Sequence, residues 1–404
     1  MSLLRQLLTQ GAGAGKPEPV APVFPVEYVF VEGTAPPYDL EYEQIPAVGP
    51  YVAAISTHPG ISYPNSQRKI VRMSDGTLYA VYHKSLAGKW QIYVKKSIDE
   101  GVTWTDDTRI STYANMAANH QLYACIAVDS NDYLHVVWYG SATGYTSEQI
   151  WYNKYTDSWA GPVRISTFTD MEDYEQYNPS IAVDSNDYLH VVWHGQTPDY
   201  DRDSQIWYSK YTDSWSAVIR ISDIAEMAGD PQTSPSIAVD SNDYLHVAWR
   251  GKADGFVAYQ VWYVKYTDSW ANPVRISTYA NMAENHQFIP SIAVDSDDHI
   301  HVVWHGLATG YLGNPQIWYA KYTDAWITPV RISDLVNMED YGQSDPSIAV
   351  DSDDYIHVLW HGTYTGYVDF VKVWYAVYTD SWADPVVLQP TGQNKYPNLR
   401  WSRW

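Results

Sequence analysis

The sequence has few cysteines, few basic residues and no long apolar run, and each shortage excludes a class of protein. Cys125 is the only cysteine among 404 residues, so the chain can form no internal disulfide and no cysteine-based zinc site. Lysine and arginine number 25 against 47 aspartates and glutamates, and the resulting charge of −22 argues against nucleic acid and anionic membranes as partners. No stretch reaches the ~18 apolar residues of a membrane span, so membrane insertion is not expected.

Phenylalanine is also scarce, whereas tyrosine and tryptophan are abundant. The chain has 6 Phe but 36 Tyr and 19 Trp, so most of its large rings carry a polar group. Such rings suit half-buried strand positions and surfaces that contact polar ligands. Hydrophobic residues make up 45% of the sequence, which is enough for a sizeable core.

The amino-terminal segment lacks the apolar region of a secretory signal peptide. A short amphipathic stretch is followed by glycines and alanines and then by a proline-rich tract, so we expect residues 1–25 to form an anchor or tether outside the globular body. We expect the protein to act in an extracellular setting or on a virion surface, which it would reach without a signal peptide. Residues 1–25 are then the segment expected to contact other virion or surface proteins.

A repeat of 55 or 56 residues fills most of the remaining sequence. The motif Ile-Ala-Val-Asp-Ser recurs five times, with its aspartate at Asp129, Asp184, Asp240, Asp295 and Asp351. A second motif, Tyr-Thr-Asp-(Ser/Ala)-Trp, ends at Trp159, Trp215, Trp270, Trp326 and Trp382. Self-similarity at a fixed period is the signature of a repeat architecture.

Each repeat contains four strand patterns, which we name A to D from the first to the last. In one copy these are 180–183, 188–194, 205–211 and 218–222, and the turn formers at 184–187 connect A to B. Strand A is apolar on both faces, as an innermost strand should be. Short antiparallel strands repeated in this way predict an all-β fold, a β-propeller of four-stranded blades. The aspartates of the A–B turn also suggest calcium, but a hairpin needs them anyway, so we expect neither a metal nor a cofactor.

The globular propeller is predicted to span residues 26–404. Six complete blades are expected at about 66–112, 121–167, 176–222, 232–277, 287–333 and 343–389. Residues 26–57 and 395–404 hold further strand patterns, with strand A at 396–401 and strands B, C and D at about 28–33, 41–45 and 49–57. We favour seven blades, with the ring closed by these terminal strands. The alternative is six blades with separate terminal arms.

The sixth, divergent repeat carries the most specific motif in the chain. Residues 97–104 read Ser-Ile-Asp-Glu-Gly-Val-Thr-Trp, which resembles the Asp-box of the sialidase-like (BNR) propeller repeats. The resemblance implies the propeller fold and nothing about catalysis, because the Asp-box is a structural turn. Sialidases of this family also need an arginine cluster, a Tyr–Glu nucleophile pair and an acidic proton donor. Arg68 lies near, but not at, the position of the family's first catalytic arginine.

No catalytic residue can be assigned from the sequence. Most arginines are copies of one strand D position, and the carboxylate pairs Glu172-Asp173 and Glu339-Asp340 are copies of each other on different blades. A catalytic dyad occurs once, whereas duplicated groups are more typical of binding. Enzymatic activity is left open, and binding is favoured.

Candidate ligand-binding residues lie in the loops between strands D and A and between strands B and C, which share one face and vary among the repeats. The residue directly after the strand B tryptophan occupies the same position in each repeat but differs in type: Tyr139, His194, Arg250, His305 and His361. Each B–C loop also carries an aromatic residue: Tyr145, Tyr200, Phe256, Tyr311 and Tyr367. Aromatic faces stack on sugars and polar neighbours bind their hydroxyls, so these residues predict a carbohydrate site. The alternative is that the rings pack over neighbouring blades.

Alternate D–A loops repeat every three blades. Tyr-Ala-Asn-Met-Ala occurs at 113–117 and again at 279–283, so equivalent sites are expected in pairs. We therefore predict a non-enzymatic, multivalent binding propeller that recognises a glycan or cell-surface receptor, for example as a virion tail fibre or decoration protein. The alternatives are a glycoside hydrolase of sialidase type and a structural scaffold that binds other proteins.

Overall fold

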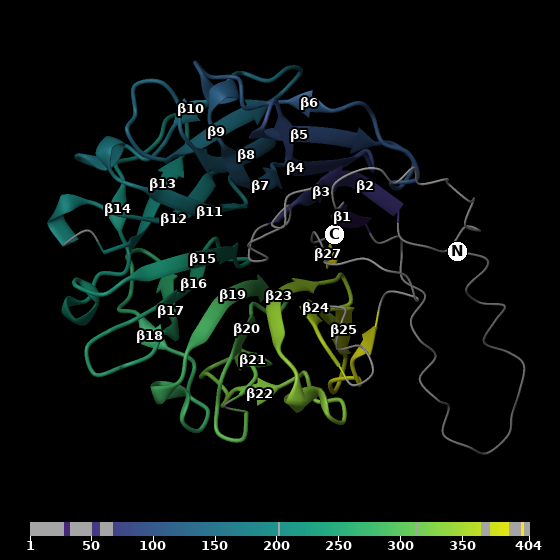
Figure 1. The fold of residues 1–404 in the computed structure, drawn as a ribbon, viewed down its shortest axis with the longest axis vertical. Helices are drawn as coiled ribbons and strands as arrows, with labels where there is room; N and C mark the ends of the chain where they lie inside the picture. The colour runs from purple at the N-terminus through teal and green to yellow at the C-terminus, as the bar shows by residue number, and fades with distance from the viewer. Residues whose placement is uncertain are drawn as a thin grey trace, which may run out of the picture.

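The structure is a computed structural model that describes residues 28–32, 51–56, 68–200, 203–311, 313–364, 372–387 and 397–399. Small β-sheets radiate from a common axis and follow one another around a ring in chain order (Figure 1). The expected tether, residues 1–25, lies outside the described residues.

Six of the sheets are four-stranded and run A, B, C, D in antiparallel order. The first two blades are β3 (Ile70–Arg72), β4 (Leu78–Leu86), β5 (Lys89–Ser97), β6 (Thr108–Arg109) and β7 (Gln121–Val128), β8 (Leu134–Gly140), β9 (Gln149–Tyr155), β10 (Val163–Arg164). The next two are β11 (Gln176–Val183), β12 (Leu189–Gly195), β13 (Gln205–Tyr211), β14 (Ile219–Arg220) and β15 (Gln232–Val239), β16 (Leu245–Gly251), β17 (Gln260–Tyr266), β18 (Val274–Arg275). The last two are β19 (Gln287–Val294), β20 (Ile300–Gly306), β21 (Gln316–Tyr322), β22 (Val330–Arg331) and β23 (Gln343–Val350), β24 (Ile356–Gly362), β25 (Lys372–Tyr378), β26 (Val386–Val387). The predicted β-propeller is confirmed.

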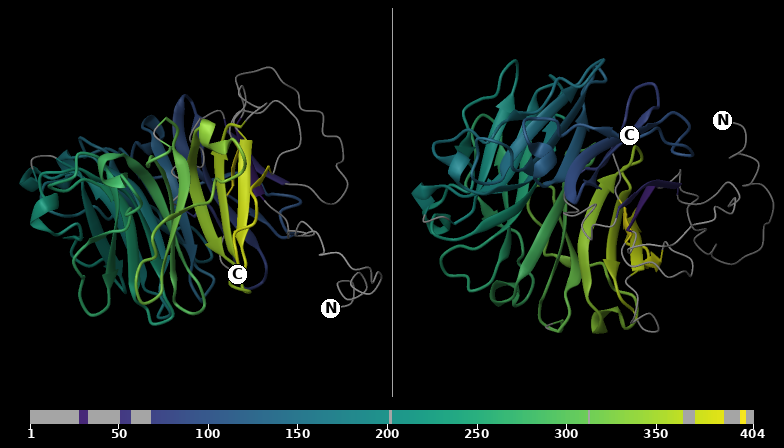
Figure 2. Two further views of the ribbon diagram at one scale, coloured as in Figure 1. Left: turned by 90° about the horizontal axis from the view of Figure 1, so that it is seen from below. Right: turned by 45° about the horizontal axis from the view of Figure 1, so that its top comes forward.

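Strands from both ends of the chain form a further, three-stranded sheet. In it β1 (Tyr28–Glu32) pairs antiparallel with β27 (Pro397–Leu399) and parallel with β2 (Tyr51–Ser56). Strand β27 contacts β24 and β25 of the last four-stranded blade, while β2 contacts β4 of the first (Figure 2). The terminal strands therefore close the ring, as predicted, and the described residues show six four-stranded blades, which is the alternative to the seven that were favoured.

The order within this closing sheet differs from the prediction. A strand at 41–45 was expected between the segments that form β1 and β2, but β1 and β2 pair directly and in parallel. The expected strand at 41–45 itself lies outside the described residues.

The helices in the described part of the chain are single 3₁₀ turns within loops: η1 (Met116–Ala118), η2 (Met171–Asp173), η3 (Pro198–Tyr200), η4 (Ala225–Met227), η5 (Met282–Glu284) and η6 (Met338–Asp340). Over those same residues, none of the helices has the length and apolar character that crossing a bilayer demands.

The turn between strands A and B is built by its first aspartate and clamps neighbouring blades. Asp184 Oδ1 accepts hydrogen bonds from the backbone N–H groups of Asn186 (3.0 Å) and Tyr188 (2.9 Å). Asp187, at a φ of +62°, accepts the backbone N–H and the hydroxyl of Ser130 in the preceding blade. The same contact joins Ser74 to Asp132, Ser185 to Asp243, Ser241 to Asp298 and Ser296 to Asp354. These aspartates are therefore occupied in holding the ring together.

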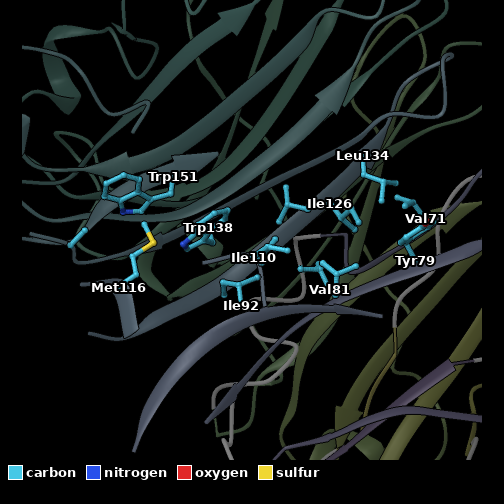
Figure 3. Packing of buried hydrophobic residues seen from close by; sticks show 14 residues of the cluster. Val71, Tyr79, Val81, Ile92, Ile110, Met116, Ile126, Leu134, Trp138 and Trp151 are labelled. Carbon is cyan, nitrogen blue, oxygen red and sulfur yellow. The ribbon is translucent and has the colours of Figure 1, made fainter. Parts of the chain in front are cut away.

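The hydrophobic cores lie between neighbouring blades. In the first of them, Val81 and Ile92 of one blade pack against Ile126, Leu134 and Trp138 of the next (Figure 3). These side chains are no more than 1% exposed. Because each core is shared, every blade is stabilised by its neighbours.

Each strand B tryptophan is held by the glutamine that starts strand A. Trp193 Nε1 donates to Gln176 Oε1 at 3.0 Å, while Gln176 Nε2 donates to the carbonyls of Tyr174 and Gln196 in the adjoining loops. Gly195 lies directly against this glutamine. Equivalent tryptophan–glutamine bonds join Trp138 to Gln121, Trp249 to Gln232, Trp304 to Gln287 and Trp360 to Gln343. The loop face is thereby built on a constant scaffold.

Candidate functional site

The variable residues that follow the strand B tryptophans lie at the inner edge of the loop face. His194 of β12 pairs with Tyr177 of β11, the innermost strand of its blade. The equivalent pairs are Tyr139 with Leu122, Arg250 with Thr233, His305 with Phe288 and His361 with Ser344. We name the side chains at this level the axial cluster, defined as Tyr139, Tyr177, His194, Arg250, Phe288, His305, Asp345 and His361.

A β-bulge in each repeated strand A shapes this level. The register of β11 shifts between Tyr177 and Ser180, and Asn178 within the shift has a φ of +50°. Positive φ recurs at the same phase at Tyr123, Ser234, Ile289 and Asp345. A positive φ at a β-branched residue such as Ile289 is strained, and bulges of this kind are frequent beside functional sites.

Aromatic rings form one side of the axial cluster. The ring of Tyr139 meets that of Tyr177 in the next blade edge-on, with centroids 4.8 Å apart, and Tyr177 lies 5.9 Å from His194. His194 Nδ1 in turn accepts the backbone N–H of Ser234 in the following blade (3.3 Å). The contacts therefore pass from blade to blade.

Charged and imidazole groups form the other side. The Arg250 guanidinium lies 4.9 Å from the centroid of Phe288, and Phe288 stacks on His305 at 5.0 Å. His305 Nδ1 accepts the backbone N–H of Asp345 at 3.2 Å, and the Asp345 carboxylate lies 3.6 Å from His361 Nε2. The structure thus brings all five predicted residues of this phase into one connected cluster.

Burial keeps two of the histidines neutral. Burial, reinforced by the positive charge of Arg250, lowers the pKa of His194 to about 3. Burial also lowers the pKa of His305 to about 4, although the Asp345 carboxylate opposes the shift. Near neutral pH these imidazoles are therefore uncharged hydrogen-bonding groups, and the guanidinium of Arg250 supplies positive charge.

The aromatic residues predicted in the B–C loops pack within their own blades. Each ring lies edge-on to the strand C tryptophan and beneath the strand D arginine. For Phe256 the centroid distances are 5.8 Å to Trp262 and 4.8 Å to the guanidinium of Arg275. Tyr145, Tyr200 and Tyr311 make the same pair of contacts. Tyr367 lies outside the described residues, and Tyr364 packs on the tryptophan of that blade. These contacts favour the packing alternative, while a ligand-binding role of these rings stays a prediction.

Phe256→Ala is expected to lower the free energy of unfolding by about 2 kcal/mol while leaving ligand binding intact. The reason is that the half-buried ring fills the space between Trp262 and Arg275. Urea denaturation measures the loss. Tyr355→Ala is the matched control, because Tyr355 is 42% exposed on the opposite face and should change stability by less than ~0.5 kcal/mol. Equal stabilities of the two variants would contradict the packing role.

The interior histidines belong to the scaffold. His190 bridges the Tyr208 hydroxyl (2.8 Å at Nδ1) and the Asp184 carboxylate (3.0 Å at Nε2). Its pKa is lowered by burial, which outweighs the opposing effect of Asp184. His135, His246, His301 and His357 make the same two contacts. These groups are satisfied internally, and in the described ranges no cluster of His, Cys, Asp and Glu has the makings of a metal site.

Sequence reasoning missed Tyr177 of the axial cluster and the carboxylates Glu148 and Glu175, which interact with it. Burial raises the pKa of Tyr177, and the charges and hydrogen bonding of Glu148 and Glu175 raise it further. Glu148 comes from the preceding blade, so its interaction with Tyr177 was not apparent in the sequence. The available signal was the variation of the residues flanking Gln149 and Gln176, since the Gln176 position is glutamine in all five strong repeats and the Gln149 position in all but the last, which has Lys372.

Comparisons with known proteins identify the fold. No protein-family model matches the sequence, and no curated protein matches it either. Among solved structures, the chain is similar to a Dyadobacter fermentans protein of unknown function, with 12% identity over 76% of this chain and 94% of that one and a TM-score of 0.51. It is also similar to an ulvan lyase, a polysaccharide lyase solved with a GlcA–Rha3S repeat (11% identity, 78% and 82% of the two chains, TM-score 0.54).

A third similar structure is an α-L-arabinanase of Penicillium chrysogenum in complex with arabinobiose. Identity is 14%, the match covers 81% of this chain and 95% of that one, and the TM-score is 0.50. At this level of identity the likeness shows a shared β-propeller fold. The chemistry of the site has to be argued from its own residues.

Proposed function

We propose that the protein is a non-enzymatic carbohydrate-binding propeller whose ligand binds at the axial cluster. The observation that carries the proposal is the variation of this cluster on a constant scaffold. Each repeat keeps its tryptophan, glutamine and glycine, yet the adjoining position is Tyr139, His194, Arg250, His305 or His361 in successive blades. Packing alone would favour one residue type at equivalent places, whereas a ligand lying across the ring axis meets each blade differently.

The chemistry of the cluster suits a sugar. The rings of Tyr139, Tyr177 and Phe288 are partly exposed, so apolar sugar faces have surfaces to contact. Neutral imidazoles of His194 and His305, together with the Asp345 carboxylate, offer hydrogen-bonding groups at the same level. The three solved structures above include two proteins of carbohydrate metabolism, which agrees with this choice of ligand class.

Arg250→Ala is expected to weaken glycan binding at least tenfold, because the guanidinium supplies positive charge to the cluster and lies between Phe288 and Tyr259. A glycan array identifies the ligand, and calorimetric titration measures the affinity. Arg72→Ala is the matched control, since it removes the same charge from the opposite face, where Arg72 pairs with Glu100. Undiminished binding by Arg250→Ala with a normal melting temperature would place the ligand elsewhere.

A glycoside hydrolase of sialidase type is the second candidate, favoured by the effect of Glu148 and Glu175 on the pKa of Tyr177. A tyrosine and a carboxylate are the nucleophile pair that such enzymes need. A fluorogenic sialoside assay separates the two functions. Saturable hydrolysis that is abolished by Tyr177→Phe would establish the enzyme, whereas binding without turnover supports the non-enzymatic function.

The glycan is proposed to be displayed on a cell or particle surface, so the protein itself would act externally, for example as a virion tail fibre or decoration protein. Residues 1–25 would then attach it to other proteins of that surface. Immunogold labelling of intact particles or cells tests the location. A scaffold that binds proteins instead would show stable co-purification with a partner and no binding on a glycan array.

A further inference from the structure

Five junctions between neighbouring blades can be compared on the loop face. At each one, the residue before the first glutamine of strand C in one blade lies beside the residue before the glutamine that starts strand A of the next. At four of the junctions a backbone bond fixes this arrangement. It runs from Gln287 N–H to the Tyr259 carbonyl (2.8 Å), and equivalent bonds join Gln176 to Glu148, Gln232 to Ser204 and Gln343 to Pro315. The five junction pairs are Trp90 with His120, Glu148 with Glu175, Ser204 with Pro231, Tyr259 with His286 and Pro315 with Gly342.

Two of these five junctions join an aromatic ring to a histidine. His120 Nδ1 accepts the backbone N–H of Trp90 at 3.3 Å, and His286 Nδ1 accepts that of Tyr259 at 3.2 Å. We name these pairs the Trp90 platform and the Tyr259 platform. They lie three blades apart, the same interval at which the D–A loops repeat. The two platforms are therefore equivalent sites on one face.

The packing of neighbouring blades in the propeller requires neither an aromatic residue nor a histidine at a junction. Two of the other junctions are closed by Ser204 with Pro231 and by Pro315 with Gly342, on the same backbone scaffold. Both platform histidines are exposed, and the rings of Trp90 and Tyr259 are partly exposed. Packing of the blades therefore does not account for the aromatic and histidine side chains at the two platforms, which indicates that they bind a ligand.

The surroundings of the two platforms differ in charge. At the Tyr259 platform, the Arg250 guanidinium lies 3.9 Å from the ring centroid and Lys252 Nζ lies 5.1 Å from it. Both cations, after burial, lower the pKa of His286. At the Trp90 platform, burial and Lys89 lower the pKa of His120, but Glu148 opposes them. The Tyr259 platform is therefore cationic, whereas the positive and negative charges around the Trp90 platform nearly balance.

We propose that the two platforms bind two sugar units of a single acidic polysaccharide chain that crosses the loop face. The Tyr259 platform takes a unit that carries a carboxylate or sulfate, and the Trp90 platform stacks a further unit of the same chain. Arg250 connects the Tyr259 platform to the axial cluster, so the chain passes over that cluster between its two end contacts. This inference rests on the proposed carbohydrate-binding function.

Two linked contacts should bind a long chain more tightly than a short one. Once one platform is occupied, the second binding event is intramolecular, and the gain in affinity is on the order of 100-fold. A disaccharide can contact only one platform, so its affinity is not raised by a second contact. Chain-length dependence therefore separates paired platforms from a single site, where affinity levels off after a few units.

The test compares Trp90→Ala, His286→Ala and the double variant in the full-length protein, with Tyr355→Ala as control and melting temperature monitored. The probes are polygalacturonate, alginate and dextran sulfate, with neutral dextran and digalacturonate for comparison. Each single substitution is expected to weaken polymer binding by up to roughly 100-fold, towards the disaccharide value, and the double variant is expected to weaken it further. Tyr355→Ala, on the opposite face, should leave both polymer and digalacturonate binding unchanged.

Three outcomes would overturn the paired platforms: polymer affinity unchanged in the double variant, polymer affinity no higher than that of digalacturonate, or equal affinity for neutral dextran. If Arg250→Ala abolishes binding while the double variant binds normally, the result supports ligand binding at the axial cluster and rejects binding at the two platforms. Failure of the wild-type protein to bind any glycan, on the array or among these polymers, would contradict both the carbohydrate-binding function and the paired platforms.

Discussion

Gly195→Ala is expected to lower the free energy of unfolding by about 3 kcal/mol. A Cβ at this position would lie 1.8 Å from Gln176 Oε1 and 2.4 Å from its Cδ, far inside any permitted contact. Gln176 is fully buried and its amide is bonded to two loop carbonyls, so it cannot turn aside without losing them. Its displacement would also leave the indole N–H of Trp193 unsatisfied in the core.

Gly229→Ala provides the matched control, since a Cβ there meets no atom within 4 Å. Equilibrium urea unfolding followed by tryptophan fluorescence measures both variants. The control should unfold within ~0.5 kcal/mol of the wild type. A small effect at Gly195 would mean that the tryptophan–glutamine bond contributes little to the blade.

The blade architecture could be predicted because the determinants of each blade are local and repeated. The Asp184 turn forms from hydrogen bonds within five residues, and its periodic recurrence marks every A–B hairpin. The interior histidines were likewise identifiable, since an unvarying polar residue within a strand indicates a fixed internal partner such as Tyr208 for His190. The pairing of β1 with β2 was not predictable, because sequence patterns do not specify whether neighbouring strands are parallel.

The site was predicted only in part, for a physical reason. Tyr139, His194, Arg250, His305 and His361 were selected because they vary at constant phase, and the structure joins them in one cluster. The partners that complete it belong to the next blade: Tyr177, Phe288 and Asp345 contact residues about 40 positions away in the sequence. No local pattern reports such contacts. The x-Pro dipeptides at 178–179 and 345–346, which accompany the bulges, were the remaining signal.

The protein is expected to lose several kcal/mol of stability as the pH falls from about 6.5 to 4, because of histidines that are buried in the neutral form. In the unfolded chain a histidine has a pKa near 6.5, so it takes up a proton over this interval. In the folded protein His194 (pKa about 3) and His305 (pKa about 4) stay neutral over most of it. The unfolded state therefore binds more protons, and the stabilisation present above pH 6.5 is lost towards pH 4.

Each of the two histidines accounts for up to about 3 kcal/mol of this change, at 1.36 kcal/mol for each unit of pKa difference. The interior histidines act in the same direction, since burial also lowers the pKa of His190, His246 and His301. Carboxylates such as Asp184 act at lower pH. Burial alone would raise the pKa of Asp184, but hydrogen bonds from His190 and the turn backbone outweigh burial and lower it.

The double variant His194→Gln/His305→Gln isolates the contribution of the axial cluster. Glutamine keeps a hydrogen-bonding side chain at both positions and cannot take up a proton, so the free energy of unfolding should depend less steeply on pH between 6.5 and 4. Urea unfolding at a series of pH values gives this dependence directly. A slope equal to that of the wild type would show that both histidines are charged in the folded protein. The cluster would then carry three positive groups beside Asp345, and it would bind anions far more strongly than the neutral imidazoles described above allow.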